Sequence, residues 1–198
     1  MGVIWLSDKS LVQKVLRGET DAYDLLVRRW EKKLFNFAYR LTGDREEALD
    51  IAQESFTRAF EQIQRLKDAE KFPHWLFRIA RNCWISNFRS NQSAFTESLT
   101  SASEEGPSIE ELLTDHVAVP VEGGHRFELN ELRLVLAKAL DTLPAEQRET
   151  VVLKIFEGMK FSEIAEIVEC PVSTVKSRLY LGLNQLRKIF TERPRGTT

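Results

Sequence analysis

The sequence predicts an all-α protein built of two small helical domains that a flexible acidic linker joins. Apolar residues recur at three- and four-residue steps in both ends of the chain, which is the period of an α-helix. No segment shows the alternation of apolar and polar residues that is typical of strands. Between the two ends lies a stretch rich in Ser, Thr, Gly and Pro with a strong excess of acidic residues, which indicates a linker.

The first domain is expected to cover residues 1–93 and to contain four helices. Side chains that can accept a hydrogen bond from a free backbone N–H precede the first three helices, and glycines follow the first two. Proline stands near the start of the fourth, where its missing N–H costs no hydrogen bond. The expected boundaries are Ser7 to Gly18, Thr20 to Gly43, Asp44 to Ile63 and Pro73 to Ser90, with Ser7, Thr20 and Asp44 as caps.

The linker is expected at residues 94–126, with one short helix at residues 108–113. From Gln92 to Leu132, nine acidic residues stand against one basic residue, Arg126, which gives a local charge of −8. The excess of like charges, together with the richness in Ser, Thr, Gly and Pro, indicates a linker or mobile loop that separates the two helical domains.

The second domain is expected to cover residues 127–192, followed by a short tail at residues 193–198. Its helices show the same apolar period as those of the first domain. Proline opens one helix and glycine closes it, as is usual for helix ends. The expected helices are residues 130–143, Pro144 to Gly158, a short helix capped by Ser162 and, after a break at residues 169–171, Val172 to Phe190.

Composition and charge exclude several classes of protein. With 42% hydrophobic and 29% charged residues, the chain has an ordinary globular composition, and its net charge of −2 excludes a globally basic nucleic-acid coat. No apolar run approaches the roughly 20 residues that span a bilayer, and the start lacks a secretory signal, so no membrane insertion is expected. Cys83 and Cys170 lie far apart with no metal-ligand pattern around them, which favours a cytoplasmic location.

The sequence contains no catalytic pattern that we recognise. His74, His116 and His125 stand at no metal-ligand spacing, and neither a Gly-rich phosphate loop nor a nucleophile elbow is present. We therefore expect no enzymatic activity, no catalytic residue, no metal and no cofactor.

Residues 161–188 have the pattern of a helix-turn-helix. In this motif the N-terminal end of the second helix enters the DNA major groove. Residues 160–198 hold seven basic against four acidic residues, so this end is locally basic. The alternative is a solvated pair of amphipathic helices, but helix length, turn and charge placement together favour DNA binding. The candidate contacts on the second helix are Ser173, Thr174, Lys176, Ser177, Arg178 and Tyr180, with Arg187 and Lys188 further along.

Residues 72–91 combine three arginines with five aromatic rings and no acidic residue. Cations neutralise phosphates and rings stack on unpaired bases, so this composition is typical of single-stranded DNA binding. The alternative is a core helix whose rings pack together. Both alternatives stay open for Trp84 and Phe88, whereas the position of Phe72 and Trp75 at the loop-to-helix junction favours DNA binding.

Three stretches together resemble the extracytoplasmic-function (ECF) sigma factors of bacterial RNA polymerase, group 4 of the sigma-70 family. Residues 43–63, which alone would be a solvated helix face, are similar to the polymerase-binding helix of the family, G-D-x-x-x-A-x-D-x-x-Q-[ED]-x-F. Residues 72–82 are similar to the loop and helix with which the family reads the −10 promoter element, W-L-[YF]-x-I-A-x-N. Residues 170–179 are similar to the helix that reads the −35 element, P-x-G-T-V-x-S-R-L. The matching residues are Gly43, Asp44, Ala48, Asp50, Gln53, Glu54 and Phe56; Trp75, Leu76, Phe77, Ile79, Ala80 and Asn82; and Pro171, Thr174, Val175, Ser177, Arg178 and Leu179.

The resemblance implies a sigma factor that directs promoter-specific initiation, with sigma region 2 in the first domain and region 4 in the second. It implies three partners: core RNA polymerase, through the clamp helices of its largest subunit and its flap; promoter DNA, with one base flipped into a pocket around residues 67–75; and a controlling anti-sigma factor. The implied polymerase contacts are Asp44, Ala48, Asp50, Gln53, Glu54 and Phe56; the −10 contacts are Lys71, Phe72, Trp75, Arg78, Arg81, Asn82 and Arg89; the −35 contacts are Ser173, Thr174, Lys176, Ser177, Arg178, Tyr180, Arg187 and Lys188.

Two positions depart from the family pattern and bear on which −35 sequence is read. Ser173 replaces a common glycine, and Leu181 lies in a stretch that is usually richer in Arg and Ala.

Three other classes of protein remain as alternatives: an ordinary helix-turn-helix regulator, a small helical enzyme, and an interaction module that keeps only the clamp helix. Only the sigma factor predicts promoter-specific initiation with core polymerase.

Overall fold

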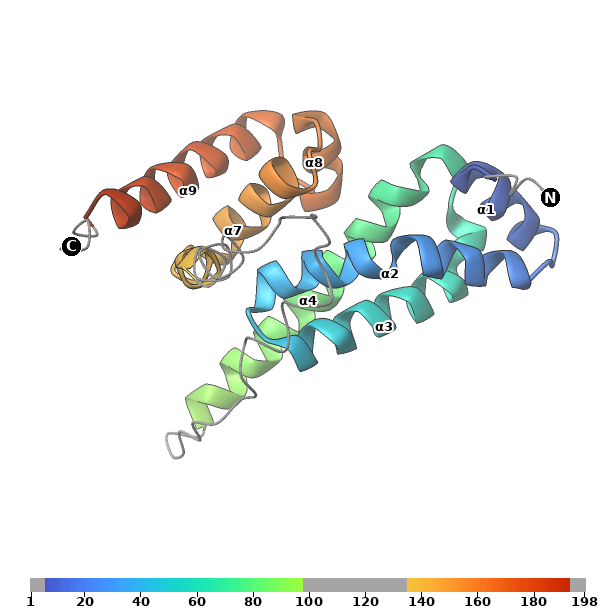
Figure 1. Cartoon of the computed structure of the whole chain (residues 1–198), viewed down its shortest axis with the longest axis horizontal. Helices are drawn as coiled ribbons and strands as arrows, with labels where there is room; N and C mark the ends of the chain where they lie inside the picture. Colours follow the sequence, from blue (N-terminus) through green and yellow to red (C-terminus); the bar gives the residue numbers. More distant parts are fainter. Residues whose placement is uncertain (1–5, 98–134, 193–198) are drawn as a thin grey trace, which may run out of the picture.

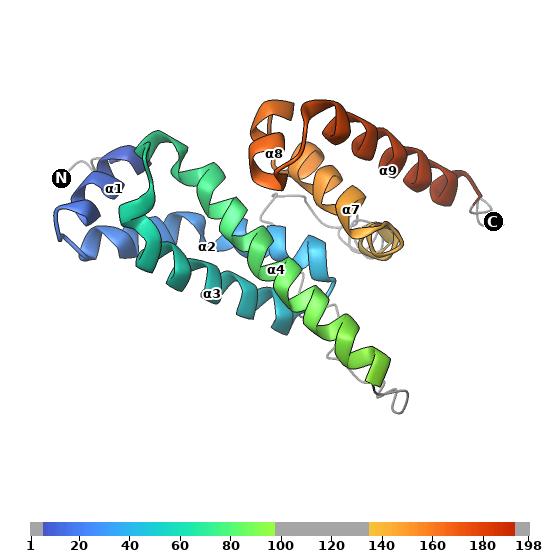
Figure 2. The ribbon, with the colours of Figure 1, turned by 180° about the vertical axis from the view of Figure 1, so that it is seen from behind.

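The computed structural model describes residues 6–97 and 135–192, and the regular elements in these ranges are all helical (Figure 1). The expected all-α class is therefore confirmed. Helices α1 to α4 form a first domain, and α7 to α9 form a second, as the view from behind also shows (Figure 2). The expected linker helix at residues 108–113 and the tail at residues 193–198 lie outside the described residues.

The first domain packs its four helices around one apolar core. Phe37 and Phe77 meet edge to face at 5.0 Å between ring centroids, and Trp84 is also buried, so core packing is the alternative that holds for this ring. Two short 3₁₀ turns, Ile63–Arg65 and Ala69–Lys71, connect the third helix to the fourth. The helices are α1, Asp8–Leu16; α2, Asp21–Thr42; α3, Arg45–Gln62; and α4, Phe72–Glu97.

Local side chains set most of the helix ends in this domain. The Ser7 hydroxyl accepts a hydrogen bond from the Ser10 N–H at 3.2 Å, and Asp44 Oδ1 accepts one from the Glu47 N–H at 2.8 Å, so both expected caps are confirmed. Gly43 closes α2 with a φ of 74°, a left-handed conformation that glycine adopts without strain. The expected cap at Thr20 is wrong: this residue is itself helical in φ and ψ, and its side chain makes no capping hydrogen bond.

Replacing Asp44 with alanine should lower the free energy of unfolding by about 0.5–2 kcal/mol, because the Glu47 N–H loses its acceptor at the start of α3. Thr20→Ala is the matched control, since Thr20 precedes α2 without such a bond. Urea unfolding followed by circular dichroism measures both. Equal losses in the two variants would contradict this role of Asp44.

The second domain consists of a helix at residues 135–141 and four elements that follow it. The turn before α9 is closed by Glu169, which has a left-handed φ of 56°. The expected cap of α8 at Ser162 is wrong, because α8 begins at Phe161 and Ser162 is already its second residue. The cap position is Lys160, whose backbone N–H donates a hydrogen bond to the Glu163 carboxylate at 2.7 Å. The elements are α7, Ala145–Val151; a π-helical turn, Val152–Phe156; α8, Phe161–Val168; and α9, Val172–Glu192.

Two further boundaries differ from expectation by several residues, whereas the other described helix ends differ by one or two. Helix α4 continues past Ser90 to Glu97, because no glycine or proline interrupts residues 91–97. The helix that Pro144 opens is α-helical only to Val151 and then widens into the π-helical turn. Within residues 6–97 and 135–192, no helix has the length and apolar character that crossing a membrane requires.

The two domains touch along α4. Helix α8 of the second domain packs against α4, and α7 with the π-helical turn packs against α2. Arg148 on α7 reaches across to the end of α2, where it donates a hydrogen bond to the Leu41 carbonyl oxygen at 2.6 Å. The beginning of α4 therefore lies at the border between the domains.

Candidate nucleic-acid interface

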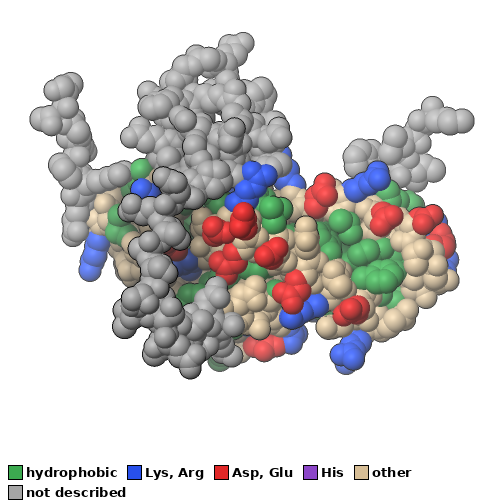
Figure 3. Space-filling view, turned by 90° about the horizontal axis from the view of Figure 1, so that it is seen from below, with side chains coloured by type: hydrophobic (Ala, Val, Ile, Leu, Met, Phe, Trp, Pro, Cys, Tyr) green, Lys and Arg blue, Asp and Glu red, His purple; other side chains and the backbone are tan. Residues whose placement is uncertain are grey.

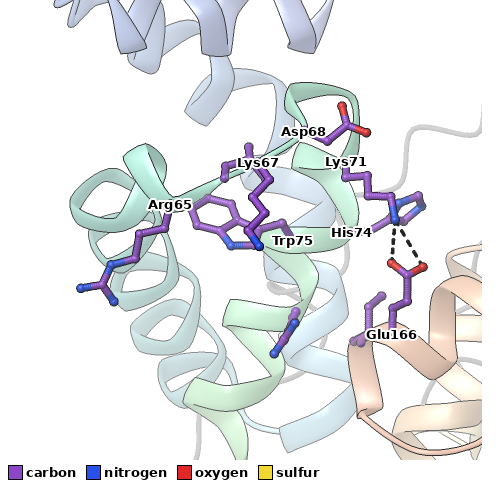
Figure 4. Close-up of a pocket in the computed structure, with 10 residues that line it drawn as sticks. Arg65, Lys67, Asp68, Lys71, His74, Trp75 and Glu166 are labelled. Carbon is purple, nitrogen blue, oxygen red and sulfur yellow. Dashed lines mark hydrogen bonds and ion pairs between the residues drawn. The ribbon is translucent and has the colours of Figure 1, made fainter.

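A pocket of about 420 Å³ opens where the 3₁₀ turns lead into α4 (Figure 4). Cationic side chains dominate the part of its wall that the first domain supplies, and Asp68 is the acidic residue there. Glu166 and Ile167 of α8 complete the wall from the second domain. The lining residues are Arg65, Leu66, Lys67, Asp68, Lys71, His74, Trp75, Arg78, Glu166 and Ile167.

The pocket has an aromatic wall as well as cations. Trp75 lines it and is partly exposed, so its ring is available for stacking. Phe72 lies against Trp75 with 6.2 Å between ring centroids, but its ring is fully buried. The expected DNA contact by Phe72 is therefore wrong. This ring is buried in the apolar core and packs against the Trp75 ring.

The remaining candidate −10 residues follow along α4. Lys71, Arg78 and Asn82 are exposed, whereas Arg81 is mostly buried beside the second domain. Arg89 belongs to α4, but its side chain lies outside the described part of the structure. Phe88 is 40% exposed, and its ring centroid lies 5.9 Å from that of Trp84. Its ring therefore packs against a core residue and also leaves a surface that DNA could contact, so both alternatives stay open for Phe88.

Arg81 is held by a buried carboxylate. Glu149 on α7 accepts hydrogen bonds from Arg81 Nε at 2.7 Å and from Nη2 at 3.3 Å, and Arg178 Nη1 lies 3.7 Å from the same carboxylate. Burial raises the pKa of Glu149, and the two arginines act in the opposite direction. One acidic residue thus links a candidate −10 cation to a candidate −35 cation.

The second domain shows the helix-turn-helix that the sequence predicts, with α8 and α9 as its two helices. Val175 and Leu179 of α9 are buried, which leaves the opposite side of its first turns open. Tyr180 is 63% exposed and Leu181, the departure from the family pattern, is 58% exposed. The exposed candidate −35 residues are Ser173, Lys176, Ser177, Tyr180, Arg187 and Lys188, while Thr174 and Arg178 are partly buried.

Helix α3 carries the candidate polymerase contacts. Asp44, Asp50 and Gln53 are exposed, and Phe56 is partly buried. Glu54 is partly buried and pairs with Arg58 at 2.6 Å. The expected contact by Ala48 needs correction, because this side chain is fully buried in the core under α3.

Sequence reasoning missed exposed apolar residues on the same helix. Leu49 is 38% exposed and Phe60 44% exposed. The face seen from below in Figure 3 shows acidic and exposed hydrophobic side chains close together. Their spacing along α3 would have been the available signal, since neither residue fits the buried stripe of the helix.

Comparison with known proteins agrees with this geometry. The family model for Sigma-70 region 2 matches residues 26–94, and the one for Sigma-70 region 4 matches residues 133–186. The RNA polymerase sigma-H factor of Pseudomonas aeruginosa is 31% identical over 182 residues, which cover 91% of this chain and 92% of that protein. The ECF RNA polymerase sigma factor SigW of Bacillus subtilis is 32% identical over 180 residues, 91% of this chain and 95% of that protein.

Solved structures share the fold. CnrH in complex with the cytosolic domain of CnrY matches with a TM-score of 0.66 and 22% identity, over 94% of this chain and 98% of that one. The sigma factor RpoE in complex with the anti-sigma factor NepR, from Bartonella quintana, matches with a TM-score of 0.63 and 23% identity, over 91% and 99%.

Fold and site define a helical transcription factor of the sigma-70 class, with a region 2 domain and a region 4 domain. Within that class, the chain belongs to the ECF sigma factors of RNA polymerase.

Proposed function

We propose that this chain guides core RNA polymerase to its promoters by dividing recognition between its two domains. The observation that carries the proposal is the pocket at the start of α4, where a partly exposed tryptophan is surrounded by Arg65, Lys67, Lys71 and Arg78. A ring that stacks on an unpaired base and cations that bind phosphate are what strand-separated DNA requires. We assign residues 1–93 and 127–192 to these two recognition tasks and residues 94–126 to the linker.

In this proposal the residues of each surface have separate tasks. A flipped −10 base enters the pocket and stacks on Trp75, while Lys71, Arg78, Arg81, Asn82 and Arg89 bind the backbone around it. Helix α9 reads the −35 duplex in the major groove. The exposed face of α3 binds the polymerase clamp. The −35 contacts are Ser173, Thr174, Lys176, Ser177, Arg178, Tyr180, Arg187 and Lys188, and the clamp contacts are Asp44, Asp50, Gln53, Glu54 and Phe56.

The chemistry of RNA synthesis belongs to the polymerase in this proposal, and the chain itself catalyses no step. Because the polymerase is intracellular, we place the chain in the cytoplasm. An anti-sigma factor is proposed as a further partner, since CnrH and RpoE, which share the fold, were solved with CnrY and the anti-sigma factor NepR.

Run-off transcription with purified core polymerase tests the proposal. Promoters are first selected from a randomised DNA library with the reconstituted holoenzyme, and one selected promoter is then transcribed with and without the chain. We expect a run-off product of defined start only when the chain is present. Tight sequence-specific duplex binding by the chain alone, without stimulation of initiation, would instead support an ordinary helix-turn-helix regulator.

A further inference from the structure

The open face of α9 is uncharged along the turns that would enter the major groove. Helices α7 and α8 pack against one side of α9, which leaves the opposite side to solvent (Figure 1). Exposed side chains recur on that side at steps of three and four residues, so they share one face of the helix. Before residue 185 they are Ser173, Ser177, Tyr180, Leu181 and Asn184.

The arginine in the first turns of α9 points away from this face. Arg178 Nη1 lies 3.8 Å from the Cys170 Sγ and 3.7 Å from the Glu149 carboxylate, and Nη2 lies 3.6 Å from the Glu146 carboxylate. Because Glu149 is 1% exposed, turning the guanidinium out toward a base would withdraw a cation from a buried carboxylate, which is unfavourable. Arg178 therefore holds α9 against α7 and is not free to pair with a guanine.

The other cations of α9 also lie off the middle of the open face. The Lys176 ammonium stands 5.6 Å from the centroid of the Phe161 ring, which belongs to the first residue of α8. Arg187 and Lys188 come about four turns after the start of α9, whereas a helix-turn-helix reads bases with the N-terminal end of its second helix. The commonest specific contact in the major groove, an arginine paired with guanine, therefore has no free arginine in the first turns of α9.

Leu181 offers an apolar surface in place of a charge. Its side chain is 58% exposed and has no hydrogen-bonding group, so it gains free energy in the groove only by covering another apolar group. The apolar group that a base presents there is the C5 methyl group of thymine. One turn earlier, the Ser177 hydroxyl donates to the Ser173 carbonyl oxygen at 3.1 Å, which leaves its oxygen as an acceptor for a base amino group. This chemistry matches adenine and thymine better than guanine, which presents only acceptors in the major groove.

Resting on the proposed function, we propose that Leu181 is a specificity-determining residue that selects a thymine in the −35 element. Its isobutyl group packs on the C5 methyl group of that thymine in the major groove. Arg178 determines the position of α9 and reads no base at this point of the element. Because Leu181 is a position where the chain departs from the family pattern, this preference belongs to the chain itself.

Deoxyuridine tests the contact without any change in the protein, since it pairs with adenine as thymine does but lacks the C5 methyl group. Each thymine in the −35 element of a promoter selected with the holoenzyme is replaced singly, on either strand. Fluorescence polarisation of the labelled promoter measures the affinity of the holoenzyme. Burial of one methyl-sized group corresponds to about a fourfold change in affinity, and we expect that loss at the thymine that faces Leu181.

Variants at two exposed leucines of α9 assign the contact to one side chain. The Leu181→Ala holoenzyme should bind the thymine promoter and the deoxyuridine promoter equally. Leu183→Ala is the matched control and should keep the difference, because each residue advances about 100° around the helix and Leu183 therefore lies on another side. Leu181→Arg should change the base selected at this position from thymine to guanine, since an exposed arginine pairs with guanine O6 and N7.

Three outcomes would overturn the proposal and leave the proposed function intact. They are a selected −35 element without thymine, a wild-type holoenzyme that binds every deoxyuridine promoter as tightly as its parent, and a Leu181→Ala holoenzyme that still distinguishes the two. Circular dichroism verifies that the variants fold, and the wild-type comparison needs no variant at all. Absence of a run-off product from the selected promoter would instead refute the proposed function, and it is measured separately from affinity.

Discussion

A chain in which Trp75 is replaced by alanine should initiate transcription about five- to 150-fold more slowly than the wild type from a matched promoter. Stacking of one base on an aromatic side chain contributes roughly 1–3 kcal/mol, and this range corresponds to that change in rate. Trp75 is partly exposed and lines the pocket, while the neighbouring Phe72 is fully buried, so the variant loses the available ring without removing the core beneath it.

Binding of core polymerase should stay unchanged in this variant, because the proposed clamp contacts lie on α3 and not at the start of α4. Single-round run-off assays and fluorescence polarisation with labelled core polymerase measure the two properties separately. Trp75→Phe is the conservative control and should keep most of the activity, since it keeps a ring at the pocket. Wild-type initiation by a folded Trp75→Ala chain would contradict the assignment of the stacking platform.

Local sequence patterns predicted most helices because the determinants of a helix are close in the chain. The caps at Ser7 and Asp44 each need one side chain and an N–H three residues later, so spacing alone identifies them. The same rule failed at two other positions. Thr20 stands before α2 but has helical φ and ψ and makes no capping bond, and Ser162 lies inside α8, which begins at Phe161. A good cap residue is therefore informative only where that residue is itself extended, as Ser7 and Asp44 are.

The candidate site was predictable in its residue types but not in its accessibility. The aromatic rings and cations of residues 72–91 are visible in the sequence. Only the packing of the helices decides that Phe72 is buried and that Trp75 is partly exposed. The partners of these cations were beyond sequence reasoning for a different reason. Arg81 and Glu149 are 68 positions apart, and nothing local to either residue marks the other as its partner.

Replacing Gly182 with valine should destabilise the second domain by about 1–3 kcal/mol, because α9 crosses α7 at this glycine without room for a side chain. A Cβ atom at this position would lie 2.9 Å from Val151 Cγ2 and 3.4 Å from the Gln147 Cβ. Val151 is 1% exposed and surrounded by core residues, so it has little freedom to move away.

The two smaller substitutions on α9 separate crowding from helix propensity. Gly182→Ala gains about 1 kcal/mol of helix propensity but still places a Cβ against Val151, so its net effect should be smaller than that of valine. Asn184→Val, at an exposed position of α9, carries the β-branched penalty without the clash. Thermal unfolding should therefore rank the midpoints with Gly182→Val lowest, and duplex binding by α9 should weaken in the same variant. If the Gly182→Val chain were as stable as the Asn184→Val chain, α7 and α9 would not need their close approach at Gly182. The position of α9 would then have to depend on its contacts with α8.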